Sequence, residues 1–200
     1  MPHNRAGVLH NGAMMPLDVL KTTDCGACDR YAAAAGVPGF TLMQSAGSAV
    51  ARAIRSRWAA RPVLILCGPG NNGGDGFVCG HVLRQAGWPV RIALLGEPSA
   101  LKGDAAAALA LWNGPVEAMT ARSPGDAGLV VDAIFGAGLS RPLDGMVAEL
   151  ATRLASARLP VVAIDLPSGI SGDQPAPEAI TFRADLTVSF HCRKPAHCLE

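Results

Sequence analysis

In the first half of the chain, Val63-Leu-Ile-Leu-Cys67 is followed at once by Gly68-Pro-Gly-Asn-Asn-Gly-Gly-Asp-Gly76. A short, continuous apolar run is typical of a strand that is buried on both faces, as in a parallel sheet. Glycines let the backbone turn tightly and approach a ligand closely. The amides at the start of the next helix, aided by the helix dipole, favour a phosphate group. We therefore predict a strand, a ligand-binding loop and a helix from about Asp75 to Ala86.

The rest of the chain alternates between the same two patterns. Further strands are predicted at 90–95, 129–132, 161–165 and 186–190, and further helices at 105–112 and 146–157. Two helices precede the first strand: Asp24 is placed to cap one that ends at Ala35 before Gly36, and Thr41 to cap the next. This alternation predicts an α/β fold with a largely parallel sheet and helices on both faces.

The composition limits the classes of protein to which the chain can belong. The chain has 200 residues, of which 50% are hydrophobic and 16% charged, and its net charge is +1. This length suits one domain, which we expect over residues 16–200 after a loose tail over residues 1–15. The near-neutral charge argues against a nucleic acid or a membrane as partner. The sequence has neither a secretory signal nor an apolar run of membrane-spanning length, so we expect a cytoplasmic protein.

The cysteines do not predict disulfides or a zinc site. There are six of them in a chain without a secretory signal, where thiols normally stay reduced. The Cys25-Gly-Ala-Cys28 pair is interpreted as the start of a helix, because no second such pair exists and no strand precedes it. His191-Cys192 and His197-Cys198 match no common zinc-ligand spacing.

Three loops that leave predicted strand ends share an unusual chemistry. They are Gly68–Asp75, Asp132–Pro142 and Asp165–Gly172, and each combines glycines with an acid or small polar residues. Ligands of parallel sheets bind at the carboxyl ends of the strands, where these loops meet. A single acid at such a position is usually a turn or cap residue, but Asp132 and Asp165 together favour a site. Carboxylates there can act as acid and base or bind a cation.

The first two loops also carry features for binding a nucleotide. The GxGxxG dinucleotide pattern is matched by Gly68, Gly70 and Gly73. The acid that usually ends the second strand of this pattern has only a poor counterpart in Glu97, which follows a glycine after Leu95. In the second loop, glycines again allow close backbone approach, and Ser140 and Arg141 can bind phosphate oxygens.

Four motifs in order resemble one known family. They are Leu42-Met-Gln-Ser-Ala-Gly47, Cys67-Gly-Pro-Gly-Asn-Asn-Gly-Gly-Asp-Gly-Phe77, Val130-Val-Asp-Ala-Ile-Phe-Gly-Ala-Gly-Leu-Ser-Arg-Pro142 and Ala163-Ile-Asp-Leu-Pro-Ser-Gly169. The later segment Ala184–Phe190 with Lys194-Pro195 fits as well. Over about residue 18 to the end, the chain resembles the YjeF N-terminal domain family, the NAD(P)HX epimerases.

The resemblance implies a Rossmann-like three-layer αβα sandwich, often dimeric, and an isomerase that interconverts the R and S epimers of NADHX and NADPHX. It also implies a potassium ion held by Asn72, Asp132 and Ser168, all hard oxygen donors. The positions that would contact the nucleotide are Asn71, Asn72, Gly73, Gly74, Asp75, Gly136, Ala137, Gly138, Leu139, Ser140, Arg141, Pro142 and Asp165.

Two departures from the family pattern bear on these expectations. Gln44-Ser45 stands where relatives commonly have Glu-Asn or Glu-Arg, which changes a contact near the pocket. The chain ends soon after the Lys-Pro segment, whereas many bacterial relatives continue into an ADP- or ATP-dependent dehydratase. We therefore expect the chain to act with a fused or separate dehydratase.

For the chemistry, a carboxylic acid must protonate the departing C6 hydroxyl, and a base must activate the water that returns. Asp165 is the first candidate and Asp132 the second, if Asp132 is not committed to the cation. Two other functions stay open on sequence alone: a non-catalytic dimeric binding or scaffold module of the same family, and an ordinary NAD(P)-dependent oxidoreductase. The single tyrosine, Tyr31, argues against the oxidoreductase, which commonly needs a Tyr/Lys pair.

Overall fold

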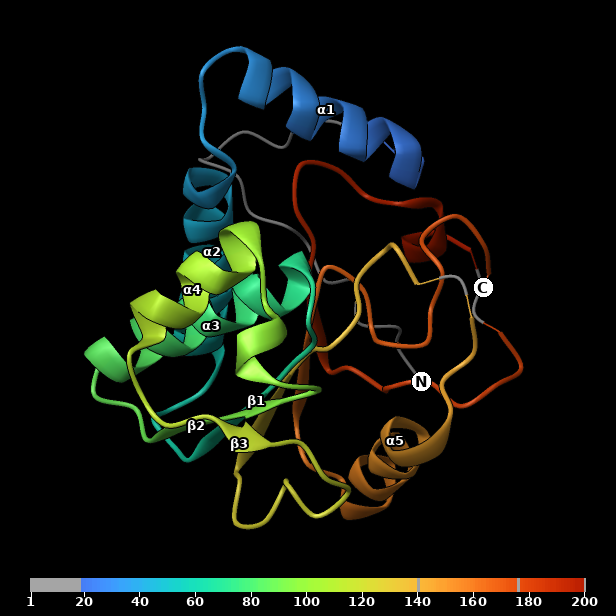
Figure 1. Cartoon of the computed structure of the whole chain (residues 1–200). Coiled ribbons are helices and arrows are strands. Elements are labelled where there is room, and N and C mark those ends of the chain that lie inside the picture. Colours follow the sequence, from blue (N-terminus) through green and yellow to red (C-terminus); the bar gives the residue numbers. More distant parts are fainter. Residues whose placement is uncertain (1–18, 140, 176, 200) are drawn as a thin grey trace.

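A computed structural model describes residues 19–139, 141–175 and 177–199 of the chain (Figure 1). The predicted tail over residues 1–15 lies outside the described residues. The strands are β1 Val63–Cys67, β2 Val90–Leu94, β3 Glu117–Ala118, β4 Leu129–Ala133, β5 Val161–Ile164 and β6 Leu186–Val188. The α-helices are α1 Thr22–Ala34, α2 Gly39–Arg57, α3 Asn71–Gln85, α4 Gly103–Trp112 and α5 Gly145–Ala157, with 3₁₀ turns at Pro98–Ala100 and Pro195–His197.

All six strands lie parallel in one sheet, in the order β3-β2-β1-β4-β5-β6. The order reverses between β1 and β4, and in open parallel sheets the loops that diverge from such a point form the ligand crevice. Val63 of β1 pairs with Val90 of β2 and with Leu129 of β4, so the three strands start level and also end level. The loops that follow β1 and β4 therefore begin side by side at one edge.

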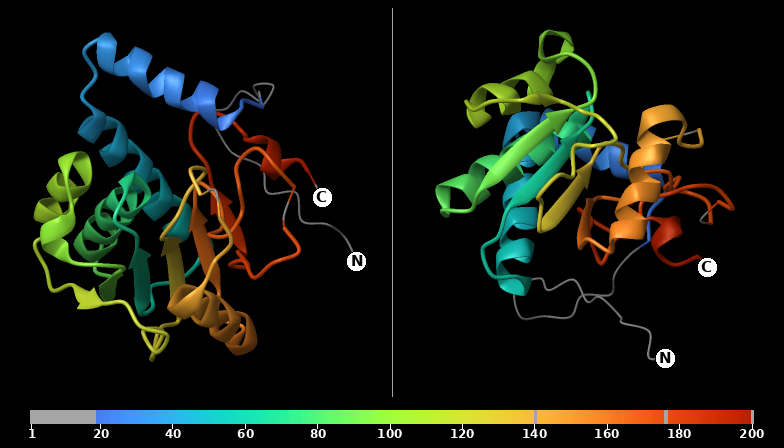
Figure 2. Two further views of the ribbon diagram at one scale, coloured as in Figure 1. Left: turned by 45° about the vertical axis from the view of Figure 1, so that its right-hand side comes forward. Right: turned by 90° about the horizontal axis from the view of Figure 1, so that it is seen from below.

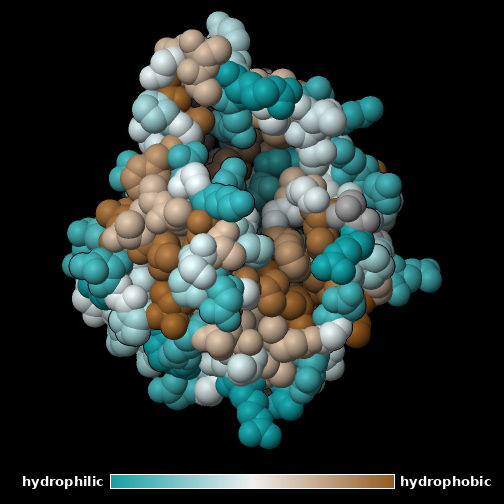
Figure 3. Space-filling model, in the orientation of Figure 1, coloured by the Kyte–Doolittle hydropathy of each residue, from teal (hydrophilic) through white to brown (hydrophobic). Residues whose placement is uncertain are grey.

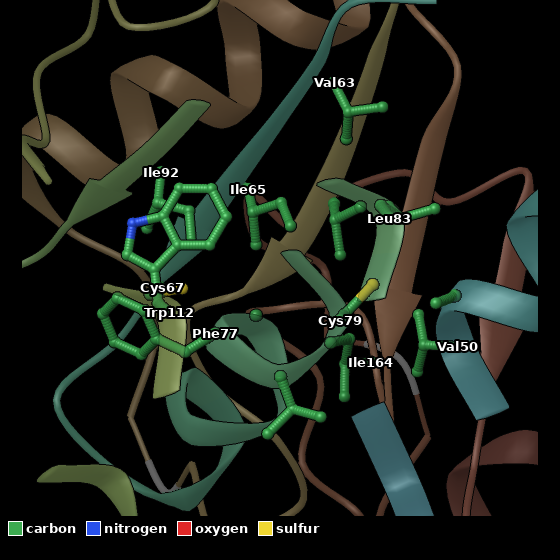
Figure 4. Close-up of a cluster of buried hydrophobic side chains, with 14 of the residues drawn as sticks. Val50, Val63, Ile65, Cys67, Phe77, Cys79, Leu83, Ile92, Trp112 and Ile164 are labelled. Atoms are coloured by element: carbon green, nitrogen blue, oxygen red, sulfur yellow. The ribbon is translucent and has the colours of Figure 1, made fainter. Parts of the chain in front are cut away.

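Helices cover both faces of the sheet (Figures 1 and 2). On one face, Ile65 packs with Val50 of α2, Leu83 of α3 and Trp112 of α4, all of them almost completely buried (Figure 4). On the other face, Leu64 packs with the apolar side of α5. Because side chains alternate along a strand, β1 contributes to both cores, which explains its uninterrupted apolar sequence. The predicted three-layer αβα sandwich with a parallel sheet is confirmed.

Helix α1 stands apart from this sandwich and is fastened to the C-terminal part of the chain (Figure 2). The backbone amide and hydroxyl of Thr22 both donate hydrogen bonds to the carboxylate of Asp173, and Asp29 pairs with His191 at 2.9 Å. Cys25 and Cys28 both lie in α1, as predicted for this pair. Within the described part of the chain, no helix is both long and apolar enough to cross a membrane.

The predicted helix starts needed correction. Helix α1 begins at Thr22 rather than after Asp24, because the distant carboxylate of Asp173 accepts the first amide hydrogen and replaces a local cap. Helix α2 begins at Gly39 and not after Thr41, since Pro38 already turns the chain with a φ of −61°. The predicted helix ends agree better with the structure than the predicted starts. Gly36 terminates α1 with a φ of +88°, as predicted.

The most consequential correction concerns α3, which begins at Asn71 and not near Asp75. The polar residues of the first loop therefore form the first turns of a helix. Gly73 makes this close packing feasible, because a methyl group on it would lie only 1.9 Å from the carbonyl oxygen of Gly68. Helices α4 and α5 begin one or two residues earlier than predicted, and β2, β5 and β6 end one or two residues earlier. Strand β3 was not predicted, because two exposed residues carry no pattern.

Candidate functional site

A cavity of about 1910 Å³ lies at the carboxyl ends of the central strands, between α1 and the sandwich. The space-filling view shows the surface hollowed beneath α1 (Figure 3). The walls combine the loops after β1, β4 and β5, which were predicted to meet, with residues of α1, α2 and the segment after β6. The volume exceeds the few hundred to about 1,000 Å³ of pockets for drug-sized ligands and leaves room for a dinucleotide.

Asp165 is placed in this cavity by an unusual turn. It follows β5 directly with a φ of +66°, in the left-handed region that few residues other than glycine, asparagine and aspartate adopt. One carboxylate oxygen, Oδ2, accepts a hydrogen bond from the amide of Ala137 at 3.0 Å. The other, Oδ1, lies 2.5 Å from Nζ of Lys194 and accepts a hydrogen bond from the hydroxyl of Ser189 at 3.1 Å. The side chain is thus fixed by three partners.

Lys194 is itself held in position by its surroundings. Its ammonium group also donates to the hydroxyl of Ser189 at 3.0 Å, and its backbone amide donates to Nδ1 of His197 at 2.9 Å. Because Nδ1 accepts, the hydrogen of a neutral His197 ring is on Nε2, which lies 3.0 Å from the carbonyl oxygen of Asp165. Burial lowers the pKa of His197 and favours this neutral form. His197 therefore connects the backbones of Lys194 and Asp165.

Asp75 is a second acid in the same cavity and lies on α3. Burial raises its pKa well above the usual range of a carboxyl group, and the negative charges of Asp165 and Asp29 raise it further. The two acids thus differ in their environments. Asp165 has a cation beside it, whereas Asp75 is in surroundings that favour its protonated form.

Asp132 lies beneath the cavity and does not line it. Its side chain is fully buried, and its carboxylate accepts hydrogen bonds from the amide of Ser168 at 2.7 Å, the hydroxyl of Ser168 at 2.7 Å and the amide of Ile134 at 3.3 Å. Burial raises the pKa of Asp132 to about 6, and the hydrogen bonds from Ser168 and Ile134 oppose this rise. Among the described residues, no basic side chain forms an ion pair with Asp132.

Gly136 brings the loop after β4 close to two functional side chains. A methyl group on Gly136 would lie 3.1 Å from Oδ2 of Asp165 and 3.2 Å from Oδ1 of Asn72. The amide nitrogen of Asn72 is buried and has no hydrogen-bond partner among the described residues. Such a group normally has a partner, so Nδ2 of Asn72 is a donor available to a ligand.

Most of the site residues predicted from sequence lie around the cavity. Those that line it are Asn71, Asn72, Asp75, Gly136, Ala137, Gly138, Leu139, Arg141 and Asp165. Gly73 and Gly74 are buried in α3, and Pro142 lines a separate cavity of about 200 Å³. Ser140 lies outside the described residues. Ser45 lines the main cavity, whereas Gln44 is exposed and does not.

The residues that hold Asp165 in place were not predicted from the sequence. Lys194 was noted only as part of a Lys-Pro segment, His197 was considered only as a zinc ligand and set aside, and Ser189 was not considered as a site residue. Residues of α1 that line the cavity, Thr22 and Asp29 among them, were missed as well. The one available signal was a lysine close to a predicted strand end, and its partner could not be identified without the path of the chain.

Comparisons with known proteins agree with this geometry. The model of the family described as YjeF-related protein N-terminus matches residues 39–196. An NAD(P)H-hydrate epimerase of Rhodobacter capsulatus is 44% identical over 196 residues, which cover 90% of this chain and 91% of that protein. An NAD(P)H-hydrate epimerase of Limosilactobacillus fermentum is 37% identical over 80% of this chain and 78% of that protein.

Two further comparisons concern the extent of the match and the fold. The bifunctional NAD(P)H-hydrate repair enzyme Nnr of Methanothermobacter thermautotrophicus is 37% identical, and the match covers 88% of this chain but only 36% of that protein. The crystal structure of yeast ynu0, YNL200c, superposes with a TM-score of 0.79 at 24% identity, over 91% of this chain and 84% of that one, which shows a common fold. With the family model spanning most of its length and relatives this similar, the chain belongs to the YjeF-related N-terminal domain family.

Proposed function

We propose that this chain is an NAD(P)H-hydrate epimerase, an isomerase that interconverts the two C6 epimers of NADHX and NADPHX. The observation that carries the proposal is the pair of acids Asp75 and Asp165 in one large cavity, with Asp165 beside a buried lysine. The names of the relatives from Rhodobacter capsulatus and Limosilactobacillus fermentum support the same activity.

The start of α3 and the loop after β4 are the proposed sites for the phosphate groups of the nucleotide. The first amides of a helix have no partner within the helix and carry the positive end of its dipole, so they bind anions. Asn71 and Asn72 supply these amides at the cavity wall. Arg141 is largely exposed, and among the described residues it forms an ion pair only with the exposed Asp144, at 3.3 Å, so its guanidinium can turn to a phosphate.

The residues present fit the potassium ion that the family resemblance implies. Asn72, Asp132 and Ser168 offer only oxygen ligands besides the Asn72 amide nitrogen, and oxygen suits an alkali cation. Asp132 is also a fully buried carboxylate without a basic partner among the described residues, which is costly unless a cation lies near it. A bound potassium ion would supply positive charge to offset the buried carboxylate of Asp132 and would help hold the loop after β5 against β4.

The environments of the two acids suggest a division of roles in the reaction. In one direction, the protonated Asp75 donates its proton to the C6 hydroxyl, the C–O bond breaks with its electron pair on oxygen, and water leaves. The lone pair of the ring nitrogen forms the C=N bond of an iminium ion, which the carboxylate of Asp165 stabilises. A water molecule then adds to the opposite face of C6 and loses its proton to Asp165. Proton exchange with solvent restores both acids.

Two of the initial expectations about catalysis are revised in this proposal. Asp165 acts as base and electrostatic partner and not as the first proton donor, because the ammonium group of Lys194 already donates a hydrogen bond to its carboxylate. Asp132 is assigned to the cation and to loop structure, because it does not line the cavity.

Substitution of Asp165 by Asn tests the proposal. Asparagine tolerates the positive φ at this position, so the turn after β5 should persist. The variant leaves the buried Lys194 without its counter-ion and should be less stable, so turnover is measured at a temperature at which the variant is shown to be folded. Loss of the base should slow epimerisation by a factor of about 10² to 10⁴. Asp126→Asn is a suitable control, because the side chain of Asp126 is 86% exposed and does not line the cavity. Full activity of the Asp165→Asn variant would remove Asp165 from the mechanism.

We further propose that the chain acts as a homodimer in the cytoplasm and works alongside a dehydratase. All six cysteines are free thiols in the structure, which suits a reducing compartment. The match to about a third of a bifunctional repair enzyme supports a dehydratase partner on a separate chain or a fused segment. Sedimentation of the purified protein would test the dimer.

A further inference from the structure

Two cysteines from opposite ends of the fold meet beside the candidate site. The sulfur atoms of Cys25 and Cys192 lie 3.3 Å apart, although 167 positions separate the residues in sequence. Cys25 lies in α1 and is 8% exposed, and Cys192 lies in the segment after β6 and is partly buried. The other cysteines of these two segments, Cys28 and Cys198, are exposed.

The contact between the sulfur atoms is supported on both sides by other contacts between the same two segments. Asp29 of α1 pairs with His191, next to Cys192 in sequence. The amide of Leu20 donates to the carbonyl oxygen of Arg193 at 2.9 Å. Helix α1 makes few contacts with the helices and strands of the sandwich. These contacts and the hydrogen bonds from Thr22 to Asp173 therefore determine where α1 lies over the cavity (Figures 1 and 2).

We propose that Cys25 and Cys192 are a modification site: a dithiol that a peroxide converts into a reversible disulfide, fastening α1 to the segment that carries Lys194. A disulfide has an S–S distance of about 2.05 Å, so the two sulfur atoms need to approach by little more than 1 Å. Other transient disulfides in reducing compartments serve as redox sensors, which is the role assigned to this pair.

The surroundings of the two thiols set the order of the chemical steps. Cys192 is the more accessible thiol, and its thiolate attacks the peroxide to give a sulfenic acid and one water molecule. Burial and the hydrogen bond with Cys192 raise the pKa of Cys25 to about 12, so Cys25 remains a thiol until the sulfenic acid forms beside it. Its sulfur then displaces the hydroxyl group of the sulfenic acid, which leaves as a second water molecule. One peroxide is reduced and two thiols are oxidised.

The disulfide would act on the site through Lys194. Cys192 precedes Lys194 by two residues, and its carbonyl oxygen lies 3.4 Å from the hydroxyl of Ser189, which in turn contacts Asp165. Pulling Cys192 toward α1 therefore shifts the groups that hold the catalytic carboxylate. A displacement of about 1 Å can slow an enzyme by as much as about 100-fold. This effect on turnover depends on the proposed function, whereas formation of the disulfide does not.

Peptide mapping under non-reducing conditions tests the proposal. The purified full chain is treated with hydrogen peroxide, then digested and analysed by mass spectrometry alongside the reduced protein. The expected product lacks two hydrogen atoms and yields one linked pair of peptides, containing Cys25 and Cys192. Cys25→Ser and Cys192→Ser should give no such pair. Cys28→Ser and Cys198→Ser are matched controls and should give it as readily as the unaltered chain.

Epimerisation is then measured on the oxidised protein before and after dithiothreitol. We expect turnover to fall with disulfide formation and to return on reduction, and the Cys25→Ser variant to keep its turnover in peroxide. Three results would overturn the proposal. They are the absence of the linked peptides, a disulfide-linked protein whose turnover equals that of the reduced protein, and a Cys25→Ser variant that loses as much turnover in peroxide as the unaltered chain. If the chain proved to have no epimerase activity at all, the proposed function would fail while the linked peptides would still decide whether this site exists.

Discussion

The ammonium group of Lys194 lies 2.5 Å from Oδ1 of Asp165, and the side chains of these two residues are only 5% and 15% exposed. Buried ion pairs are costly to form, and removing one partner leaves the other charge buried without compensation. Here the pair connects the turn after β5 with the segment after β6, and His197 bonds to the backbone of both partners. The structure thus places a cation against one carboxylate in the cavity and holds that carboxylate in a fixed orientation.

Replacing Lys194 by Met should destabilise the protein and inactivate it. The variant leaves the Asp165 carboxylate without its cation, which costs about 3–5 kcal/mol of the free energy of unfolding for a buried pair. Urea unfolding and a turnover assay check both effects. Lys102→Met is the control, because Lys102 is exposed; equal effects of the two variants would contradict the role of the ion pair.

Replacing Gly136 by Ala should impair the site with little effect on the fold. The added methyl group would lie 3.1 Å from Asp165 and 3.2 Å from Asn72, closer than most such contacts. The loop or the two side chains must shift, and turnover should fall by about tenfold or more, given the sensitivity of enzymes to small displacements. Gly128→Ala serves as control, because its methyl group would make only ordinary contacts, with Arg61. A Gly136→Ala variant as active as Gly128→Ala would show that this close approach is unimportant.

The stability of the protein should fall in mild acid because of His197. Its pKa is lowered in the folded state, so the unfolded chain binds a proton more readily than the folded one. The contribution of the neutral ring is therefore fully present above the unfolded pKa of about 6.5 and is lost as the pH falls below it. The free energy of unfolding of His197→Gln, measured by urea titration, should depend less on pH across this range. An identical pH dependence of variant and unaltered chain would exclude His197 as the cause.

Potassium should stabilise the protein through Asp132. An ion that binds only the folded state raises the free energy of unfolding by about 2.7 kcal/mol at a concentration 100 times its Kd. Thermal unfolding at constant ionic strength should therefore occur at a higher temperature in KCl than in a tetramethylammonium salt, and removal of potassium should reverse the gain. Asp132→Asn should abolish the difference. A gain of equal size in this variant would place the ion elsewhere.

The fold could be predicted from the sequence because its decisive signals are local. The strand Val63–Cys67 needs only its own apolar residues to identify it, and parallel strands bring Asp132 and Asp165 to one edge of the sheet whatever the loops do. The start of α1 was predicted less well, because a distant group accepts the hydrogen of its first amide. The carboxylate of Asp173, 151 positions from Thr22, takes the place of a local cap.

The candidate site could be predicted only in part, for the same physical reason. The loops that follow β1, β4 and β5 are recognisable from their glycines and acids. The cation of Asp165 is not, because Lys194 reaches it through the path of the C-terminal segment, and no spacing in the sequence specifies that path. The contact between Cys25 and Cys192 likewise depends on where α1 lies, which short-range patterns do not determine.

The most direct test of the central claim is to incubate the purified protein with one pure epimer of NADHX and to follow the other by chromatography. We expect the second epimer to appear much faster than in buffer alone, the absorbance of the reduced nicotinamide not to change as it would in hydride transfer, and Asp165→Asn to fail to accelerate the conversion. An epimer composition that changes no faster with the protein than without it would contradict the account and favour a non-catalytic binding module.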